Sequence, residues 1–148
     1  MSETLPHESI QSSVPESDAS ASVESLKQLV REFVDERNWR QFHSPKNLAM
    51  SLAIETAELM EHFQWLTTDE SHDVRQQPEV LAEVQEELAD VLCYALALSN
   101  ELEIDISRAI HAKMQKNRAK YPADKFRGRY GHRDQRPSDG TSESPPTG

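Results

Sequence analysis

The chain has 148 residues with a formal net charge of −10, and 36% of them are hydrophobic. A single Cys excludes an intramolecular disulfide framework, and no apolar run approaches the ~20 residues that a membrane span needs. No basic and then apolar segment opens the chain, so we expect no secretory signal, a cytoplasmic location and no membrane partner.

The two ends of the chain differ in composition from its middle. Residues 1–22 are rich in Ser, Glu and Pro, and residues 131–148 have the same character. Such segments bury too little apolar surface to fold. We therefore expect a disordered tail at 1–22, one folded domain at 23–130 and a second disordered tail at 131–148. Because Gly is rare and Ala, Leu and Glu are frequent, the domain is predicted to be all-α.

Four helices are predicted in the folded domain from their apolar periodicity. They span residues 23–37, 45–65, 78–102 and 106–120. Ser44 is expected to cap the second helix, with Pro45 at its first position, and Asp105 or its neighbour to cap the fourth. Residues 67–77 are polar and are predicted to form a loop. Short connections between the helices imply an antiparallel four-helix bundle, in which Cys93 is expected to be a buried core thiol.

Four carboxylates stand in two pairs with i,i+3 spacing, Glu55 with Glu58 and Glu87 with Asp90. At about 100° per residue, Glu55 projects into the apolar face of the second helix and Glu58 lies at its edge. Glu87 borders the apolar stripe of the third helix, with Asp90 on the same side. Two helices that turn such pairs toward a shared interior would form a cage for a hard cation.

The acid pairs need a partner, because close like charges repel and an unpaired buried carboxylate costs several kcal/mol. A Mg²⁺ ion would relieve that cost, since it takes oxygen ligands and keeps some of its water. The alternative is that the acids pair with Lys or Arg, but the second and third helices and the loop between them offer only Lys46 and Arg75. Zinc is not expected, because no His or Cys stands at ligand spacing.

The fourth helix has a basic face that a phosphate chain could contact. Lys113, Asn117 and Lys120 recur at i, i+4 and i+7, and Tyr121 follows directly. This face could bind phosphate oxygens by charge-assisted hydrogen bonds, or it could be an ordinary basic helix C-terminus. Side chains that could stack on a base or pack in the core come from three other segments. They are Trp39, Phe42, His43, Trp65 and Tyr94.

Charge is distributed unevenly along the chain. Residues 49–106 carry fourteen acidic residues and one basic residue, whereas residues 107–136 carry ten basic and two acidic residues. An acidic segment followed by a basic one could bind a cation and a polyanion that are held together. Alternatively, both segments could be ordinary solvated helix faces. A non-catalytic helical interaction module with an acidic face is therefore the rival hypothesis. A nucleic-acid polymer is not an expected partner, because the acidic middle opposes it.

With these residues assembled, the chain resembles the MazG-like, all-α NTP pyrophosphatase superfamily, and within it the dCTP pyrophosphatase branch. The resemblance covers roughly residues 26–122. Its motifs are Glu-Arg-Asn-Trp-Arg-Gln-Phe-His from Glu36, Glu55-x-x-Glu58 followed by Phe-Gln-Trp65, Glu87-x-x-Asp90 with Tyr94, and Lys113-Met-x-x-Asn117-Arg-x-x-Tyr121-Pro. Glu-x-x-Glu alone is a weak signal, whereas four motifs in this order are specific.

The resemblance implies Mg²⁺-dependent hydrolysis of a (d)NTP, such as dCTP or a modified dCTP, to the monophosphate and pyrophosphate. It implies that the four acids bind the metal and act in catalysis, and that the protein is a homodimer or homotetramer. The nucleotide-binding residues it implies are Trp39, Arg40, Gln41, Phe42, His43, Trp65 and Tyr94, with Lys113, Asn117 and Tyr121 on the phosphate side. Where animal members have a substrate-contacting His on the first helix, this chain has Val30, which leaves the preferred base open.

Overall fold

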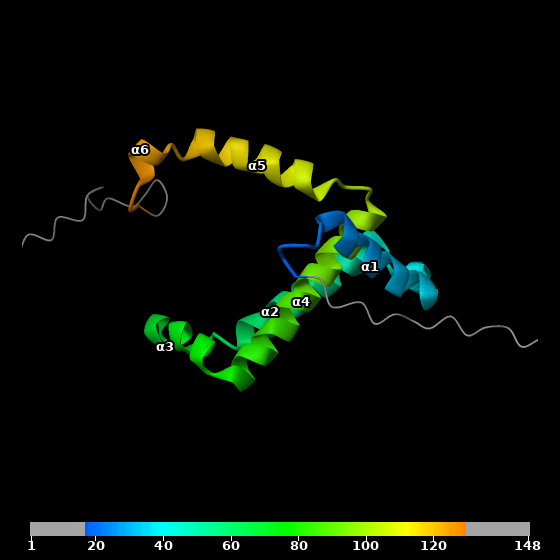
Figure 1. Ribbon diagram of the computed structural model, residues 1–148, viewed down its shortest axis with the longest axis horizontal. Coiled ribbons are helices and arrows are strands. Elements are labelled where there is room, and N and C mark those ends of the chain that lie inside the picture. Colours follow the sequence, from blue (N-terminus) through cyan, green and yellow to red (C-terminus); the bar gives the residue numbers. More distant parts are fainter. Residues whose placement is uncertain (1–16, 130–148) are drawn as a thin grey trace, which may run out of the picture. The chain divides into compact units, whose positions relative to one another are not determined.

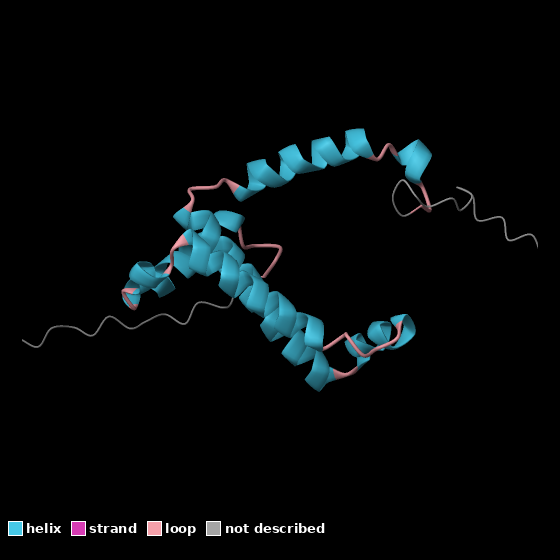
Figure 2. Ribbon diagram, turned by 180° about the vertical axis from the view of Figure 1, so that it is seen from behind, coloured by secondary structure: helices cyan, strands magenta, loops and turns pink. Residues whose placement is uncertain are grey.

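The computed structural model describes residues 17–129, and Figure 2 shows that helix is the only regular structure in this range. The predicted all-α class is therefore confirmed. The chain divides between Leu102 and Glu103 into two compact units, and each unit is described by itself. The tail boundaries expected at residues 22 and 131 stay predictions, because residues 1–16 and 130–148 lie outside the described range.

The first unit is built on two long helices. It contains α1 (Val23–Glu36), the 3-10 helix η1 (Trp39–Phe42), α2 (Pro45–Glu61), α3 (Thr68–Asp73), the 3-10 helix η2 (Val74–Gln76) and α4 (Pro78–Glu101). Helices α2 and α4 run antiparallel and side by side, and α1 packs on α4 (Figure 1). The second unit contains α5 (Ile106–Lys120) and the short α6 (Ala123–Phe126).

Local sequence sets where the helices begin. The Ser44 hydroxyl accepts a hydrogen bond from the Asn47 backbone N–H at 3.3 Å, and Pro45 occupies the first turn, where its missing N–H has no helical partner. Asp105 caps α5 in the same way, accepting from the Arg108 backbone N–H at 2.8 Å. Both predicted caps are therefore confirmed.

Two parts of the sequence prediction are wrong between residues 62 and 77. Helix α2 ends at Glu61 instead of continuing to Trp65, and the chain turns as the Phe63 and Gln64 backbone N–H groups both bond to the Met60 carbonyl. The predicted loop contains α3 and η2. Their signal was present in the sequence as a capping box, because Thr67 and Glu70 exchange side-chain and backbone hydrogen bonds.

Few side chains are buried within the described part of the chain. The buried hydrophobic residues are Val34, Leu48, Val74 and Ala97, which come from four different elements of the first unit. Asn100 fastens α1 to α4, because its side chain donates to the Lys27 carbonyl at 2.9 Å and accepts from Arg31 at 3.0 Å. These contacts hold the α1 face against the C-terminal half of α4.

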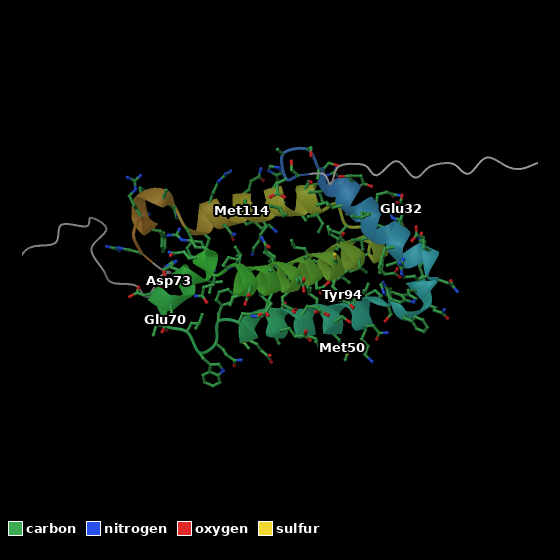
Figure 3. All side chains as sticks on the ribbon, turned by 60° about the horizontal axis from the view of Figure 1, so that its bottom comes forward. Glu32, Met50, Glu70, Asp73, Tyr94 and Met114 are labelled. Atoms are coloured by element: carbon green, nitrogen blue, oxygen red, sulfur yellow. The ribbon has the colours of Figure 1, made fainter. Side chains whose placement is uncertain are left out.

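Large apolar side chains are exposed on α2 and α4. Met50 and Ile54 are 57% and 55% exposed, and Leu92 is 54% exposed. Figure 3 shows Met50 on the side of α2 that is turned away from α4, whereas Tyr94 lies on the side of α4 that faces α2. None of the described helices is both long enough and apolar enough to cross a membrane.

Candidate metal centre and its adjoining cavity

The packing of α2 against α4 brings three of the predicted metal-binding acids together. One carboxylate oxygen each of Glu55, Glu58 and Glu87 lies within 4.8 Å of the other two. Glu55 and Glu58 are one helical turn apart on α2, and Glu87 reaches them from α4. Carboxylates from two helices thus lie close together, as the sequence indicated.

Asp90 is the fourth member of this group by its electrostatic effect. The pKa of Glu55 is raised above its usual value, first because burial disfavours the charged form and then because Glu58, Asp90 and Glu87 repel that charge. Asp90 itself is exposed and is not among the three acids whose oxygens converge. We call Glu55, Glu58, Glu87 and Asp90 the acid cluster.

The acid cluster has the properties of a cation site. Among residues 17–129, none of its four carboxylates forms an ion pair with Lys, Arg or His. The Oε2 atom of Glu87 is buried and has no hydrogen-bond partner. A buried carboxylate oxygen without a partner is costly, and an oxygen-binding divalent cation would remove the cost. The residues present therefore fit a bound metal ion.

A cavity of about 440 Å³ lies between α1 and α4 and includes Asp90 in its wall. We call it the α1–α4 cavity. Its lining residues are Leu29, Val30, Phe33, Val34, Trp39, His43, Asp90, Cys93, Tyr94 and Ala97. Such a volume is in the range of small-molecule sites. Three predicted nucleotide-binding residues, Trp39, His43 and Tyr94, thus lie in one wall with a member of the acid cluster.

A second cavity of about 380 Å³ shares those three residues. Trp39, His43 and Tyr94 also line this space, together with Phe42, Asn47, Leu48 and Ser51. The Trp39 ring meets the Phe33 ring edge-on, with 5.8 Å between centroids, and lies 6.5 Å from the His43 ring. Trp39 and His43 therefore lie between the α1–α4 cavity and the second cavity.

Two further predicted binding residues of η1 are engaged within the protein. The Arg40 guanidinium forms two hydrogen bonds to Asp35 and holds the pKa of that carboxyl below its usual value. The Gln41 side chain donates to the Asn38 carbonyl at 3.0 Å. Both interactions fix the turn that follows α1, so these residues position η1 whatever else they contact.

The remaining predicted site residues lie away from this wall or in the second unit. Trp65 follows α2 in a turn and is 87% exposed. Lys113 and Asn117 belong to α5, and Tyr121 is its C-cap, with its ring edge-on to Phe126 at 5.2 Å. These three residues belong to the second unit, and their phosphate-side role stays a prediction.

Sequence reasoning was wrong about Cys93. The thiol was expected in the core, but Cys93 is exposed and lines the α1–α4 cavity. Partial burial, and next the charge of Asp90, raise the pKa of the thiol. Sequence reasoning gave Phe33 no binding role, although it lines the cavity together with Val30. The apolar periodicity of the first helix gave no sign that its side chains border an open space.

The fold and the acid cluster belong to a known class of protein. Residues 50–131, more than half of the chain, match the model of the MazG-like family. The chain therefore belongs to the MazG-like family, as its motifs suggested. The matched region contains all four residues of the acid cluster and helices α4 and α5.

Particular relatives share this similarity. The chain is 43% identical to dCTP pyrophosphatase 1 of Rattus norvegicus over 106 residues, which cover 72% of this chain and 62% of that protein. It is 44% identical to dCTP pyrophosphatase 1 of Homo sapiens over 101 residues, 68% of this chain and 59% of the relative. The chain thus matches less than two thirds of the length of these relatives.

A solved structure agrees with these matches. The crystal structure of a pyrophosphatase from Archaeoglobus fulgidus superposes with a TM-score of 0.62 and 48% sequence identity. The match covers 67% of this chain and 91% of the archaeal chain. Both the fold and the family assignment therefore rest on sequence and structure together.

Proposed function

We propose that the protein is a Mg²⁺-dependent nucleoside triphosphate pyrophosphohydrolase. The observation that carries this proposal is Asp90, which acts electrostatically on Glu55 in the acid cluster and also lines the α1–α4 cavity. A cation site and a cavity of nucleobase size are thereby joined through one side chain. The pyrophosphatase names of the relatives support the same reaction class.

The reaction gives a monophosphate and pyrophosphate from a (d)NTP, with dCTP or a modified dCTP as the expected substrate. Glu55, Glu58, Glu87 and Asp90 would hold Mg²⁺, which when bound shields phosphate charge and stabilises charge in the transition state. A carboxylate of the acid cluster orients or deprotonates the attacking water. Trp39, His43 and Tyr94 would hold the base. The family resemblance implies that Lys113, Asn117 and Tyr121 contact the phosphates.

We also propose that the protein works as a homodimer or homotetramer in the cytoplasm. The resemblance implies such an assembly, and the exposed apolar residues Met50, Ile54 and Leu92 support it. Side chains of this size left in water on two helices indicate a surface that another chain covers. A second copy is the partner that the family resemblance favours.

The decisive experiment measures pyrophosphate release from a panel of dNTPs with and without Mg²⁺. We expect Glu58→Gln and Asp90→Asn to lower turnover by orders of magnitude without loss of helical circular dichroism, because each removes an anionic oxygen from the acid cluster. Glu61→Gln makes the same chemical change one turn further along α2, outside the cluster, and is expected to keep its activity.

The rival hypothesis, a non-catalytic helical interaction module, makes the opposite prediction. It expects no pyrophosphate release from any nucleotide and no effect of Mg²⁺. Near-normal turnover by both the Glu58 and Asp90 variants would also contradict the proposed role of the acid cluster.

A further inference from the structure

The segment η1 has few interactions of its own that fix its position. It is a single turn of 3-10 helix, a conformation with poorer hydrogen-bond geometry than an α-helix. None of its residues is buried, no side chain caps its start, and Asn38 before it has a left-handed backbone conformation. Trp39 in η1 and His43 directly after it nevertheless line both larger cavities. Their positions therefore depend on the contacts that η1 makes with its neighbours.

Side-chain hydrogen bonds connect η1 to the helices on either side of it. Toward α2, the Asn47 side chain donates to the Phe42 carbonyl at 3.0 Å. Toward α1, the Arg40 guanidinium donates to the Asp35 carboxylate from both Nε and Nη2, the latter at 2.7 Å. Among the residues that the structure describes, this is the only ion pair that joins η1 to another element. Two parallel hydrogen bonds of this kind fix direction as well as distance.

The Asp35–Arg40 pair lies in the wall of a small polar space of about 60 Å³. The other polar residues in this wall are Arg31, His43, Asn100 and Glu101. Neither Asp35 nor Arg40 lines the α1–α4 cavity or the second cavity. The hydrogen bonds to Asp35, and next its charge, raise the pKa of Arg40. The guanidinium is thus engaged with a protein carboxylate, outside the two spaces that are large enough for a base.

We propose that the Asp35–Arg40 ion pair positions Trp39 and His43 for nucleotide binding, and that Arg40 itself contacts no part of the nucleotide. The inference rests on the proposed function and concerns how its site is held in place. Asp35, to which neither the motifs nor the resemblance gave a role, becomes a positioning residue. Arg40 becomes one too, in place of the nucleotide contact that the resemblance implied. A site that is ordered before its ligand arrives has less conformational entropy to lose on binding.

Asp35→Asn and Arg40→Gln each break the pair by removing one of its charges. We expect each variant to raise KM for dCTP by about two- to fivefold, the range that an exposed ion pair supplies. Turnover should stay close to its original value, because the acid cluster is carried by α2 and α4 and not by η1. Glu36→Gln is the matched control. It breaks the local ion pair with Arg37, which does not reach η1, and should leave both constants unchanged.

The double variant, Asp35→Asn with Arg40→Gln, separates positioning from direct contact. If Arg40 acts only through Asp35, the double variant has the same KM as either single variant, because the pair is broken only once. A guanidinium that also contacts the nucleotide would make Arg40→Gln raise KM further in a protein that already carries Asp35→Asn. That further rise would overturn the inference.

Amide hydrogen exchange tests the position of η1 without any substrate. The His43 backbone N–H bonds to the Arg40 carbonyl at 3.1 Å, and this bond closes the turn. We expect Asp35→Asn to speed exchange across residues 39–43 by about two- to fivefold, while α2 and α4 keep their rates. Glu36→Gln should leave the exchange of all three segments unchanged.

An unchanged KM in Asp35→Asn, or unchanged exchange of residues 39–43 in that variant, would overturn the positioning role. So would a loss in kcat as large as the rise in KM, because the pair would then act on the chemical step. Failure of the proposed function gives a different result, namely no pyrophosphate release by the unmodified, Mg²⁺-supplied protein, and the inference falls with it.

Discussion

The carboxylate of Glu55 lowers the stability of the metal-free fold, and the same carboxylate is a proposed metal ligand. It is half-buried between α2 and α4, and its pKa is raised by burial and by the three neighbouring acids. A folded protein that raises the pKa of an acid is destabilised when that acid ionises. The acid cluster therefore weakens the metal-free fold at neutral pH, and a bound cation would offset this cost.

This cost has a testable pH dependence. Because the folded-state pKa of Glu55 lies above the value of 4.5 for a free Glu side chain, the folded state binds more protons than the unfolded state above that pH. The contribution of Glu55 to stability is thus present at low pH and is lost as the pH rises through the raised pKa. Glu55→Gln should remove this loss and raise the thermal midpoint of the metal-free protein near neutral pH by a few degrees.

Thermal unfolding in EDTA across the acid to neutral range measures the effect, and Glu61→Gln, exposed on the same helix, provides the control. A Glu55→Gln midpoint that falls with pH as steeply as that of the original protein would contradict the assignment. Added Mg²⁺ should stabilise the original protein more than this variant, since the variant has lost one anionic ligand.

Each of the two acid pairs could be predicted from sequence because it depends on local spacing. Residues at i,i+3 on a helix share a face whatever the tertiary structure, so Glu55 with Glu58 follows from the helix alone. The exposure of Cys93 could not be predicted in this way. It depends on how far α1 stands from α4, and neither Leu92 nor Tyr94 beside it encodes that distance.

At the scale of elements, helix beginnings were easier to predict than helix ends. Ser44-Pro45 and Asp105 are strong local start signals, and both hold. The end of α2 is marked by neither Gly nor Pro. The turn after Glu61 forms from ordinary residues, with the Phe63 and Gln64 backbone N–H groups bonded to the Met60 carbonyl. Such a turn leaves no local pattern to recognise.

Helix α1 depends on one residue of α4 for its position. Asn100 bonds to Lys27 and Arg31, which are 73 and 69 residues away in sequence. We expect Asn100→Ala to lower the free energy of unfolding by about 1–3 kcal/mol, because it leaves partly buried polar groups without a partner. Urea titration followed by circular dichroism measures the change.

Asn47→Ala is the matched control for this prediction. The Asn47 side chain makes one local hydrogen bond, to the Phe42 carbonyl at 3.0 Å, and joins no distant elements. We expect the smaller loss of stability from this variant. Equal losses from the two Asn variants would show that Asn100 does not fasten α1 to α4.

At the scale of the whole molecule, the described residues bury few large apolar side chains and expose many. A chain with so small a core is marginal by itself, and association is a common remedy. If a second copy covers the outer face of α2, Ile54→Glu should shift the protein toward monomer, because a carboxylate would be buried without a partner. Size-exclusion chromatography with light scattering measures the mass.

Val23→Glu adds the same charge to a half-exposed apolar position on α1 and serves as the control for this experiment. We expect it to keep the mass of the original protein. A monomer for the unmodified chain at micromolar concentration would contradict the proposed assembly, whatever the mutant shows.

The two tryptophans differ in solvent exposure, so the fluorescence of one of them can report on the cavity. Trp65 is 87% exposed, whereas Trp39 is 42% exposed and packs against Phe33 in the cavity wall. Replacing Trp65 by Phe leaves a single indole, and its fluorescence then originates at the cavity alone. Nucleotide entry can be followed as quenching or a wavelength shift of that one emitter, separately from any chemical step.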